Sequence, residues 1–478
     1  MGKYVIRTSS TMKEKLDVQF ARAIYACNIP FSAAENPEMK KLMTMARGGS
    51  YNPPTRQALS GKLLDKVSED CEEVIKENLN GRQVTLVQDG WSNVHNNPII
   101  GSCLHTGKKA FFVRAVDTGS EKKTAEYIAE LTKTEIERCE VQYGCKVIGF
   151  VSDNEAKMLR TRAIIQESNG IEVVGCAAHY LNLVQKDVTP KTVVARVVEV
   201  QKYFKNCHQP QGWLREKVGS VKPQLPNDTR WGSHVACVDT FLRNYSHYIA
   251  IRSEHSDEID PDVAKLIDNI AIYRNAKSLL DQLKLVAIAL DKLQADACSL
   301  GDGVHIWLEL AAAEELKPYR DVIMKRFSQW LTPAHMVAYM SHPKHKGRGL
   351  TSQQEETAQQ WLAQKNPQFL PPLLMMQIQD ERLPKTMFME EVVSSLSPAS
   401  WWLLMGKKVA KEEPLPDGLI ELMSQLHRLP TSSASIERLF SSFGLVQSKI
   451  RNQLGNEKAA KLVKCYRMLR SPTDDDWE

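Results

Sequence analysis

The sequence predicts a mixed α/β protein, in which a β-rich core interrupts an otherwise helical chain of 478 residues. Two observations lead to this prediction. Short apolar runs rich in β-branched residues fall between residues 84 and 174, and the spacing of apolar residues is helical on either side. A chain of this length has room for two to four domains, or for one domain interrupted by a large insertion.

The first part of the chain is predicted to be a helical N-terminal region over residues 1–78. Apolar residues such as Leu16, Phe20 and Ile24 follow the helical period. The pair Pro53-Pro54 interrupts this stretch, and a second helix is expected to begin near Leu59.

The pattern changes at Arg82, after which five strands and two helices are predicted. The first strand is expected to close in a turn at Asp89-Gly90, and helices are expected over residues 124–142 and 156–167. The order β-β-β-α-β-α-β describes an antiparallel meander followed by parallel strands with crossover helices, which is the order of a ribonuclease-H-like fold. The predicted strands are Val84–Val87, Pro98–Leu104, Ala110–Val116, Lys146–Val151 and Ile171–Val174.

Strand signals fade after about Pro190, and amphipathic or apolar helices follow. We therefore expect the core to begin at residues 79–188, to be interrupted by an all-α insertion at 189–425, and to resume at 426–478. Near its end, a helix is predicted to start after Pro430–Ser433. The expected helices of the insertion include Val193–Phe204, Asp262–Ala295, His305–Leu316, Tyr319–Leu331 and Gln353–Gln364.

Composition excludes several classes of protein. The net charge of +5 does not by itself establish nucleic-acid binding, although Lys449–Arg470 is strongly basic. The ten cysteines include no C-x-x-C pair, which argues against a disulfide framework and a zinc finger and favours reduced thiols. The apolar runs are far shorter than the ~20 residues of a membrane span, and the first residues do not read as a secretory signal.

Two aspartates follow buried strands that should be parallel neighbours. Asp89 follows the first strand and Asp153 the fourth, so both carboxylates are expected at the same edge of the sheet. Two such oxygen donors suit Mg²⁺, and a two-ion site would hold ions ~3.5–4 Å apart. The alternative is an Asp-Gly turn at 89 and a helix N-cap at 153. Glu437 is the candidate third ligand, and its alternative is a glutamate that complements a helix dipole.

Five sequence blocks resemble those of the hAT family of DNA transposases, in family order over roughly residues 55–470. Two surround the aspartates, one resembles a C-x-x-H block, one an Arg-Trp block, and the last a C-terminal dimerisation motif that continues through Ser448–Leu454. The blocks are Leu86–Ser92, Gly149–Met158, Gly175–Leu183, Asp228–Ser233 and Leu429–Ser441.

The resemblance implies roles for individual residues. Asp89, Asp153 and Glu437 would be the catalytic, metal-binding triad, with Mg²⁺ or Mn²⁺. Trp231 would stack on a base flipped out beside the cleavage point, next to Arg230, whereas spacing alone leaves open a core tryptophan beside a surface arginine. His179 would contact DNA or orient a carboxylate near the active site. Zinc at Cys176 and His179 is not expected, because two ligands do not make a tetrahedral site.

The resemblance also implies partners and a location. The insertion would help to bind DNA and to build a homodimer or higher homo-oligomer, with apolar residues such as Leu439, Phe440 and Leu445 serving subunit packing as well as the core. Most family members begin with a BED-type zinc finger, and this sequence has no Cys/His quartet near its start. Two functions therefore stay open: a nuclear transposase core that cuts and joins DNA, or a domesticated, catalytically silent DNA-binding and dimerising regulator.

Overall fold

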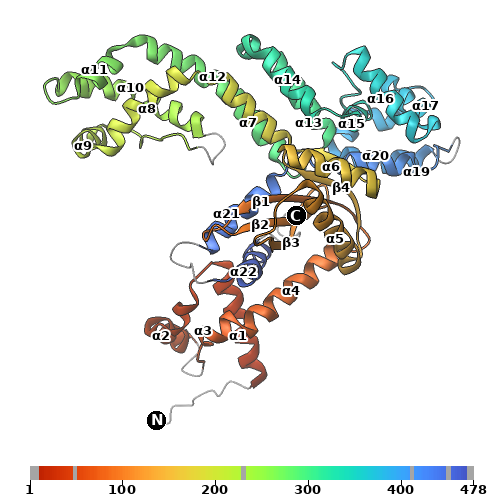
Figure 1. Cartoon of the computed structure of the whole chain (residues 1–478), viewed down its shortest axis with the longest axis horizontal. Helices are drawn as coiled ribbons and strands as arrows, with labels where there is room; N and C mark the ends of the chain where they lie inside the picture. Colours follow the sequence, from red (N-terminus) through yellow and green to blue (C-terminus); the bar gives the residue numbers. More distant parts are fainter. Residues whose placement is uncertain (1–9, 47–50, 228–232, 410–413, 448–453, 471–478) are drawn as a thin grey trace. The chain divides into compact units, whose positions relative to one another are not determined.

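The computed structural model describes residues 10–46, 51–227, 233–409, 414–447 and 454–470. The chain forms two compact units, Met1–Gly175 with Arg428–Glu478, and Cys176–His427. The first unit contains a five-stranded sheet with helices, and all described elements of the second unit are helices (Figure 1). The predicted fold class, an α/β core with helical regions, is confirmed. Among the described residues, every helix is too short or too polar to span a membrane.

The N-terminal helices lead into the sheet. The Tyr25 hydroxyl donates to the carbonyl of Leu59 at 2.7 Å. This hydrogen bond joins the helix Ser10–Ala26 to the helix Arg56–Ser60. The last of these helices carries buried apolar residues on one side, as its period requires. The helices are α1 (Ser10–Ala26), η1 (Phe31–Glu35), α2 (Pro37–Ala46), α3 (Arg56–Ser60) and α4 (Lys62–Leu79).

The sheet has the order β3-β2-β1-β4-β5, with β1, β2 and β3 antiparallel and β4 and β5 parallel to β1. The predicted turn at Asp89-Gly90 is wrong: β1 continues to Ser92, because its residues stay paired with β2 as far as Pro98. The strands are β1 (Gln83–Ser92), β2 (Pro98–His105), β3 (Ala110–Asp117), β4 (Lys146–Ser152) and β5 (Glu172–Gly175).

One face of the sheet, which we call the proximal face, is covered by helices adjacent to it in the sequence. They are α4, α5 (Ala125–Tyr143) and α6 (Ala156–Asn169). Leu86 and Phe150 of the sheet belong to one buried cluster with residues of all three helices. The predicted crossover helices therefore form and supply the main core of this unit.

The opposite face, the distal face, is covered by the C-terminal part of the chain. α21 (Ala434–Val446) lies beside β1 and β2, and α22 (Asn456–Met468) packs against α4 and β3 (Figure 1). The ring of Phe443 packs 5.0 Å from that of Trp91 on β1 and 5.8 Å from that of Phe112 on β3. A segment distant in sequence thus covers the distal face of the sheet.

The second unit is built around long helices, of which α12 runs beside α7 and α10 (Figure 1). The expected single helix over Asp262–Ala295 is wrong, because Asn269 ends α11 and caps α12 by accepting from the N–H of Ala271 at 3.1 Å. The first helices are α7 (Ala177–Val188), α8 (Lys191–Asn206), α9 (His208–Glu216), α10 (Ser233–Glu254), α11 (Pro261–Asp268) and α12 (Ile270–Gln294).

A buried cluster that contains Trp307, Phe327 and Trp330 joins the first of the remaining helices to α7 and α12. The helix expected over His305–Leu316 ends at Ala312 and is followed by a 3₁₀ turn. The elements are α13 (Leu300–Ala312), η2 (Glu314–Tyr319), α14 (Arg320–Trp330), α15 (Pro333–Met340), α16 (Ser352–Lys365), η3 (Pro367–Phe369), α17 (Leu370–Ile378), η4 (Lys385–Phe388), α18 (Glu390–Ser395), α19 (Pro398–Val409) and α20 (Leu419–Leu426).

Candidate functional site

Asp89 projects from β1 toward the distal face, beneath α21. It is paired with Gly101 of β2, and paired residues of antiparallel strands carry their side chains on the same face. A Cβ atom built on Gly101 would lie 2.8 Å from the Trp91 ring and 3.1 Å from Cδ1 of Ile436 on α21. Gly101 therefore allows α21 to approach the strand pair beside Asp89.

Asp153 lies at the same end of the sheet as Asp89. Val87 of β1 is the register partner of Val151 of β4, and each aspartate follows its valine by two residues. Asp89 still lies within β1, whereas β4 ends at Ser152, so Asp153 begins the loop that follows β4 at the same end of the sheet. The expectation that they share one edge of the sheet thus agrees with the register.

Asp89 and Asp153 also line one cavity of about 170 Å³ at the end of the strands. Lys123 and Lys157 line it too, and Lys157 forms an ion pair with Glu155 at 2.7 Å. Burial lowers the pKa of Lys123, and the neighbouring ammonium of Lys157 lowers it further. The cavity thus combines oxygen donors for a cation with lysine side chains able to meet a phosphate group.

The turn that carries Asp153 is held by Arg162, a buried residue of α6. Its guanidinium donates to the hydroxyl of Ser152 at 2.9 Å, to the carbonyl of Asp153, and to the side-chain oxygen of Asn154 at 3.2 Å. Asp153 itself accepts from the N–H of Glu155 at 3.2 Å, and Glu155 is the N-cap residue of α6. The alternative of an N-cap at Asp153 is therefore wrong.

A buried polar chain lies directly behind Asp89. The Gln88 amide donates to the hydroxyl of Ser102 at 2.9 Å and accepts from that of Thr132 at 2.7 Å, which joins β1, β2 and α5. Buried polar groups that satisfy one another in this way fix a unique backbone position. Neither Gln88 nor Arg162 was predicted from the sequence, because nothing in their spacing indicates a buried partner.

Glu437 lies in the first turn of α21 and is half-buried. Its neighbour Ile436 contacts the position opposite Asp89, so the helix stands over the face from which Asp89 projects. The oxygen atoms of Asp89, Asp153 and Glu437 do not, however, form a group within 4.8 Å of one another. One ion bound at ~2.1 Å by all three would need oxygens within ~4.2 Å, whereas two ions ~4 Å apart accept oxygens up to ~8 Å apart.

The other predicted site residues belong to the second unit or lie outside the described residues. His179 is half-buried in the first turn of α7, and Cys176 is its buried N-cap residue. Arg230 and Trp231 fall in the segment 228–232, which lies outside the described residues. Their roles in DNA binding stay predictions.

A second group of possible metal ligands was not predicted from the sequence. Asp302, His342 and His345 of the second unit each offer one ligand atom, and these atoms lie within 4.8 Å of one another. The spacing of the two histidines, three residues apart in a turn after α15, is the signal that could have indicated the group.

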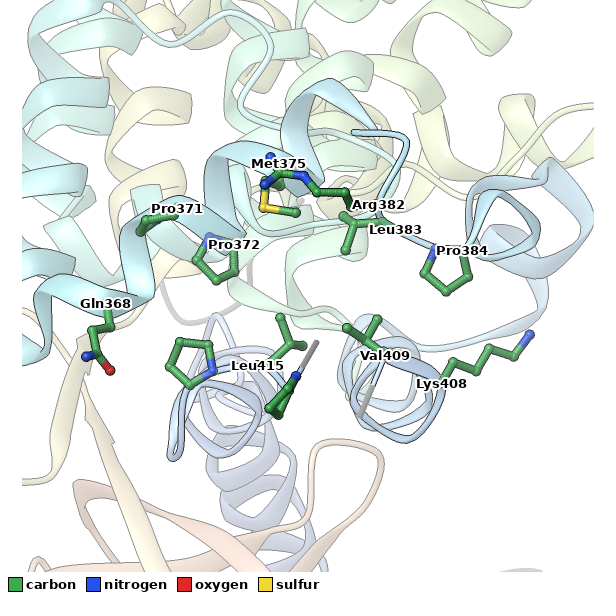
Figure 2. Close-up of a pocket in the computed structure, with 12 residues that line it drawn as sticks. Gln368, Pro371, Pro372, Met375, Arg382, Leu383, Pro384, Lys408, Val409 and Leu415 are labelled. Atoms are coloured by element: carbon green, nitrogen blue, oxygen red, sulfur yellow. The ribbon is translucent and has the colours of Figure 1, made fainter. Parts of the chain in front are cut away.

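The second unit also contains a cavity of about 730 Å³, and five of its twelve lining residues are prolines (Figure 2). Pro371 and Pro372 come from α17, and the wall also includes Leu383, Leu415 and the charged side chains of Arg382 and Lys408 (Figure 2). Among the described residues, the lining includes no carboxylate, histidine or thiol, and its charged groups are the guanidinium of Arg382 and the ammonium of Lys408.

Comparison with protein families gives one match. The model of a domain of unknown function, DUF659, matches residues 54–204, which include all five strands. This domain is found in hAT-like transposase-related proteins. The comparison with curated proteins gives no match. Over residues 54–204, the chain is therefore similar to transposase-related proteins.

Proposed function

We propose that this chain is the core of a hAT-type DNA transposase, which cleaves and joins DNA strands with the help of divalent cations. The observation that carries the proposal is that Asp89, near the end of β1, and Asp153, directly after its parallel neighbour β4, lie in the wall of one cavity. The match to a domain found in transposase-related proteins supports it.

The donor set fits a hard cation. Asp89 and Asp153 offer only oxygen atoms, the ligands that Mg²⁺ and Mn²⁺ prefer, and Glu437 would add a third carboxylate from α21. Bound there, Mg²⁺ would supply an activated nucleophile and charge neutralisation at the leaving oxygen. Arg162 holds the Asp153 turn in place, and Lys123 is placed to meet a phosphate of the substrate.

The partners and location belong to the same proposal. DNA would be the substrate, and His179, Arg230 and Trp231 would contact it near the cleavage point. A homodimer or higher homo-oligomer would form through the C-terminal region, where Leu445 is 56% exposed while Leu439 and Phe443 are buried in the chain's own core. Action on chromosomal DNA would place the protein in the nucleus.

Strand cleavage tests the proposal. Full-length protein is incubated with Mg²⁺ or Mn²⁺ and labelled duplexes that carry the sequences flanking its gene. We expect nicking by the wild type, and a loss of at least about 100-fold in Asp89→Asn and Asp153→Asn, as befits removal of a metal ligand. Asp117→Asn, the same change at the end of β3, is the matched control and should retain activity. Equal nicking by the wild type and Asp89→Asn would remove Asp89 from the mechanism.

A domesticated, catalytically silent DNA-binding regulator is the second candidate. One observation motivates it: the three carboxylates do not form a group that a single ion could bind, so cleavage would depend on a two-ion site. DNA binding without metal-dependent nicking, unchanged in Asp89→Asn, would establish this function instead of the first.

A further inference from the structure

We propose that Asp302, His342 and His345 form a binding site for a late first-row divalent cation, with zinc as the representative ion. The site is separate from Asp89 and Asp153, and it goes beyond the proposed nuclease function. Its three ligands come from one helix start and one turn of the second unit.

Local sequence brings these residues together. Asp302 lies in the first turn of α13, where a capping box with Ser299 occupies its Oδ2 atom at 2.6 Å from the serine hydroxyl. A Cβ atom built on Gly301 would lie 2.9 Å from the carbonyl oxygen of Ala338 on α15. The absence of a side chain at Gly301 therefore lets α13 approach α15, while the capping box directs Oδ1 toward the turn that follows α15.

The distances between the ligand atoms fit a tetrahedral ion. Oδ1 of Asp302 lies 3.2 Å from Nε2 of His342 and 3.4 Å from Nε2 of His345. Tetrahedral bonds of ~2.0–2.1 Å place neighbouring ligand atoms ~3.4 Å apart. Two imidazole nitrogens and one carboxylate oxygen form the ligand set of many three-residue zinc sites, which keep a fourth position open.

The rings are held in place before any ion binds. The His345 ring stacks on that of His305 at 4.0 Å and lies 4.2 Å from that of His342. The side chains of His342 and His345 are each only 6% exposed. A ring fixed on both sides loses little freedom on coordination, which favours binding.

The competing explanation is a pair of hydrogen bonds from the two imidazoles to Asp302. Nδ1 of His342 accepts from the N–H of Lys344 at 3.1 Å, so the neutral ring carries its proton on Nε2 and donates it to Asp302. Coordination through Nε2 moves that proton to Nδ1 and gives up the bond from Lys344. Two hydrogen bonds of His342, the one to Asp302 and the one from Lys344, are thus exchanged for a metal–nitrogen bond, while the Asp302 carboxylate becomes a ligand of the ion.

An ion can reach the site from a cavity of about 850 Å³, whose wall includes His305 and His345. The cavity also supplies room for water as the fourth ligand. Lys344, Lys346 and Arg348 line it as well, and their charges oppose a bare cation. The affinity should therefore fall below that of a closed site with four protein ligands.

Zinc titration of the full chain tests the proposal. Protein stripped with a chelator is titrated calorimetrically with Zn²⁺, and Co²⁺ absorption reports the coordination geometry. We expect one equivalent bound in the wild type, weakened at least about 100-fold in His342→Asn and in His345→Asn. His305→Asn alters the ring that stacks on His345 but removes no ligand, so it should stay within about twofold. Equal zinc affinity in the wild type and both ligand variants would overturn the site.

A second measurement guards against variants that fail to fold. Zinc should raise the Tm of the wild type in proportion to the logarithm of its concentration, and Co²⁺ should give the intense absorption of a tetrahedral ion. The absence of both effects in the wild type overturns the proposal without any variant. Asp89→Asn should bind zinc like the wild type, so a failure of the nuclease proposal and a failure of this one remain distinguishable.

Discussion

The two faces of the sheet receive their cover from very different parts of the chain. The proximal face is covered by α4, α5 and α6, which precede, interrupt or follow the strands directly. The distal face is covered by α21, which begins only at Ala434. The face covered by local segments is largely apolar, whereas the other one carries Asp89 and the helix of Glu437. Two of the proposed metal ligands thus belong to the face that is covered last along the chain.

The largest effect is expected on the proximal face. Phe150 is fully buried on β4 and belongs to the cluster that joins the sheet to its three helices. Phe150→Ala should lower the free energy of unfolding by about 3–5 kcal/mol, because it leaves a cavity in a closely packed core. Chemical denaturation measures this value. A loss below ~1 kcal/mol would mean that this face is not the main core of the unit.

A smaller effect is expected where the two faces are linked. Arg162 lies on α6 of the proximal face but holds the turn of Asp153. Arg162→Met should cost about 1–3 kcal/mol of stability, since buried acceptors lose a charged donor. It should also lower nicking, because the Asp153 carboxylate is no longer fixed. Unchanged nicking with reduced stability would give Arg162 a purely structural role.

On the distal face, the close approach of α21 depends on Gly101. Gly101→Ala places a methyl group against the Trp91 ring and Ile436, and we expect a loss of about 1–3 kcal/mol from overpacking. Hydrogen exchange should localise the effect, with faster exchange of α21 amides and unchanged exchange in α5. Faster exchange in both helices would show that the two faces unfold as one.

The smallest expected effect is an increase in the free energy of unfolding. Gly444 lies inside α21, and a Cβ atom built there meets no heavy atom within 4 Å. Gly444→Ala should raise stability by about 0.5–1 kcal/mol, because alanine loses less backbone freedom in a helix. It is the matched counterpart of Gly101→Ala in the same helix–sheet region. A destabilising result in thermal unfolding would indicate that this side of α21 is covered by another surface, such as a second subunit.

Sequence patterns predicted the sheet well because its strands are short, apolar and separated by clear turns. The order of the five strands and the crossover helices followed from these patterns alone. The prediction failed at Asp89-Gly90, where turn-forming residues sit inside β1, because pairing with β2 overrides local preference. It also failed at Asn269, whose capping hydrogen bond divides a stretch with continuous helical period.

The candidate site was only partly readable from the sequence. Spacing predicted that Asp89 and Asp153 share a sheet edge, since parallel strands fix the level of the residues that follow them. It could not predict the guanidinium of Arg162 or the group of Asp302, His342 and His345, because these depend on tertiary packing. Gly301 illustrates the difficulty: its function is to let two helices approach, which no local pattern reveals.

The late arrival of α21 has a consequence for synthesis of the protein. Roughly 260 residues separate the end of β5 at Gly175 from the start of α21 at Ala434. At ~5–20 residues per second, a ribosome needs roughly 13–50 s to make that stretch. During this interval Trp91, Phe112 and the glycines of the distal face are exposed to solvent. A nascent-chain chaperone would have its natural binding surface there, and its release would coincide with the packing of α21 on the distal face.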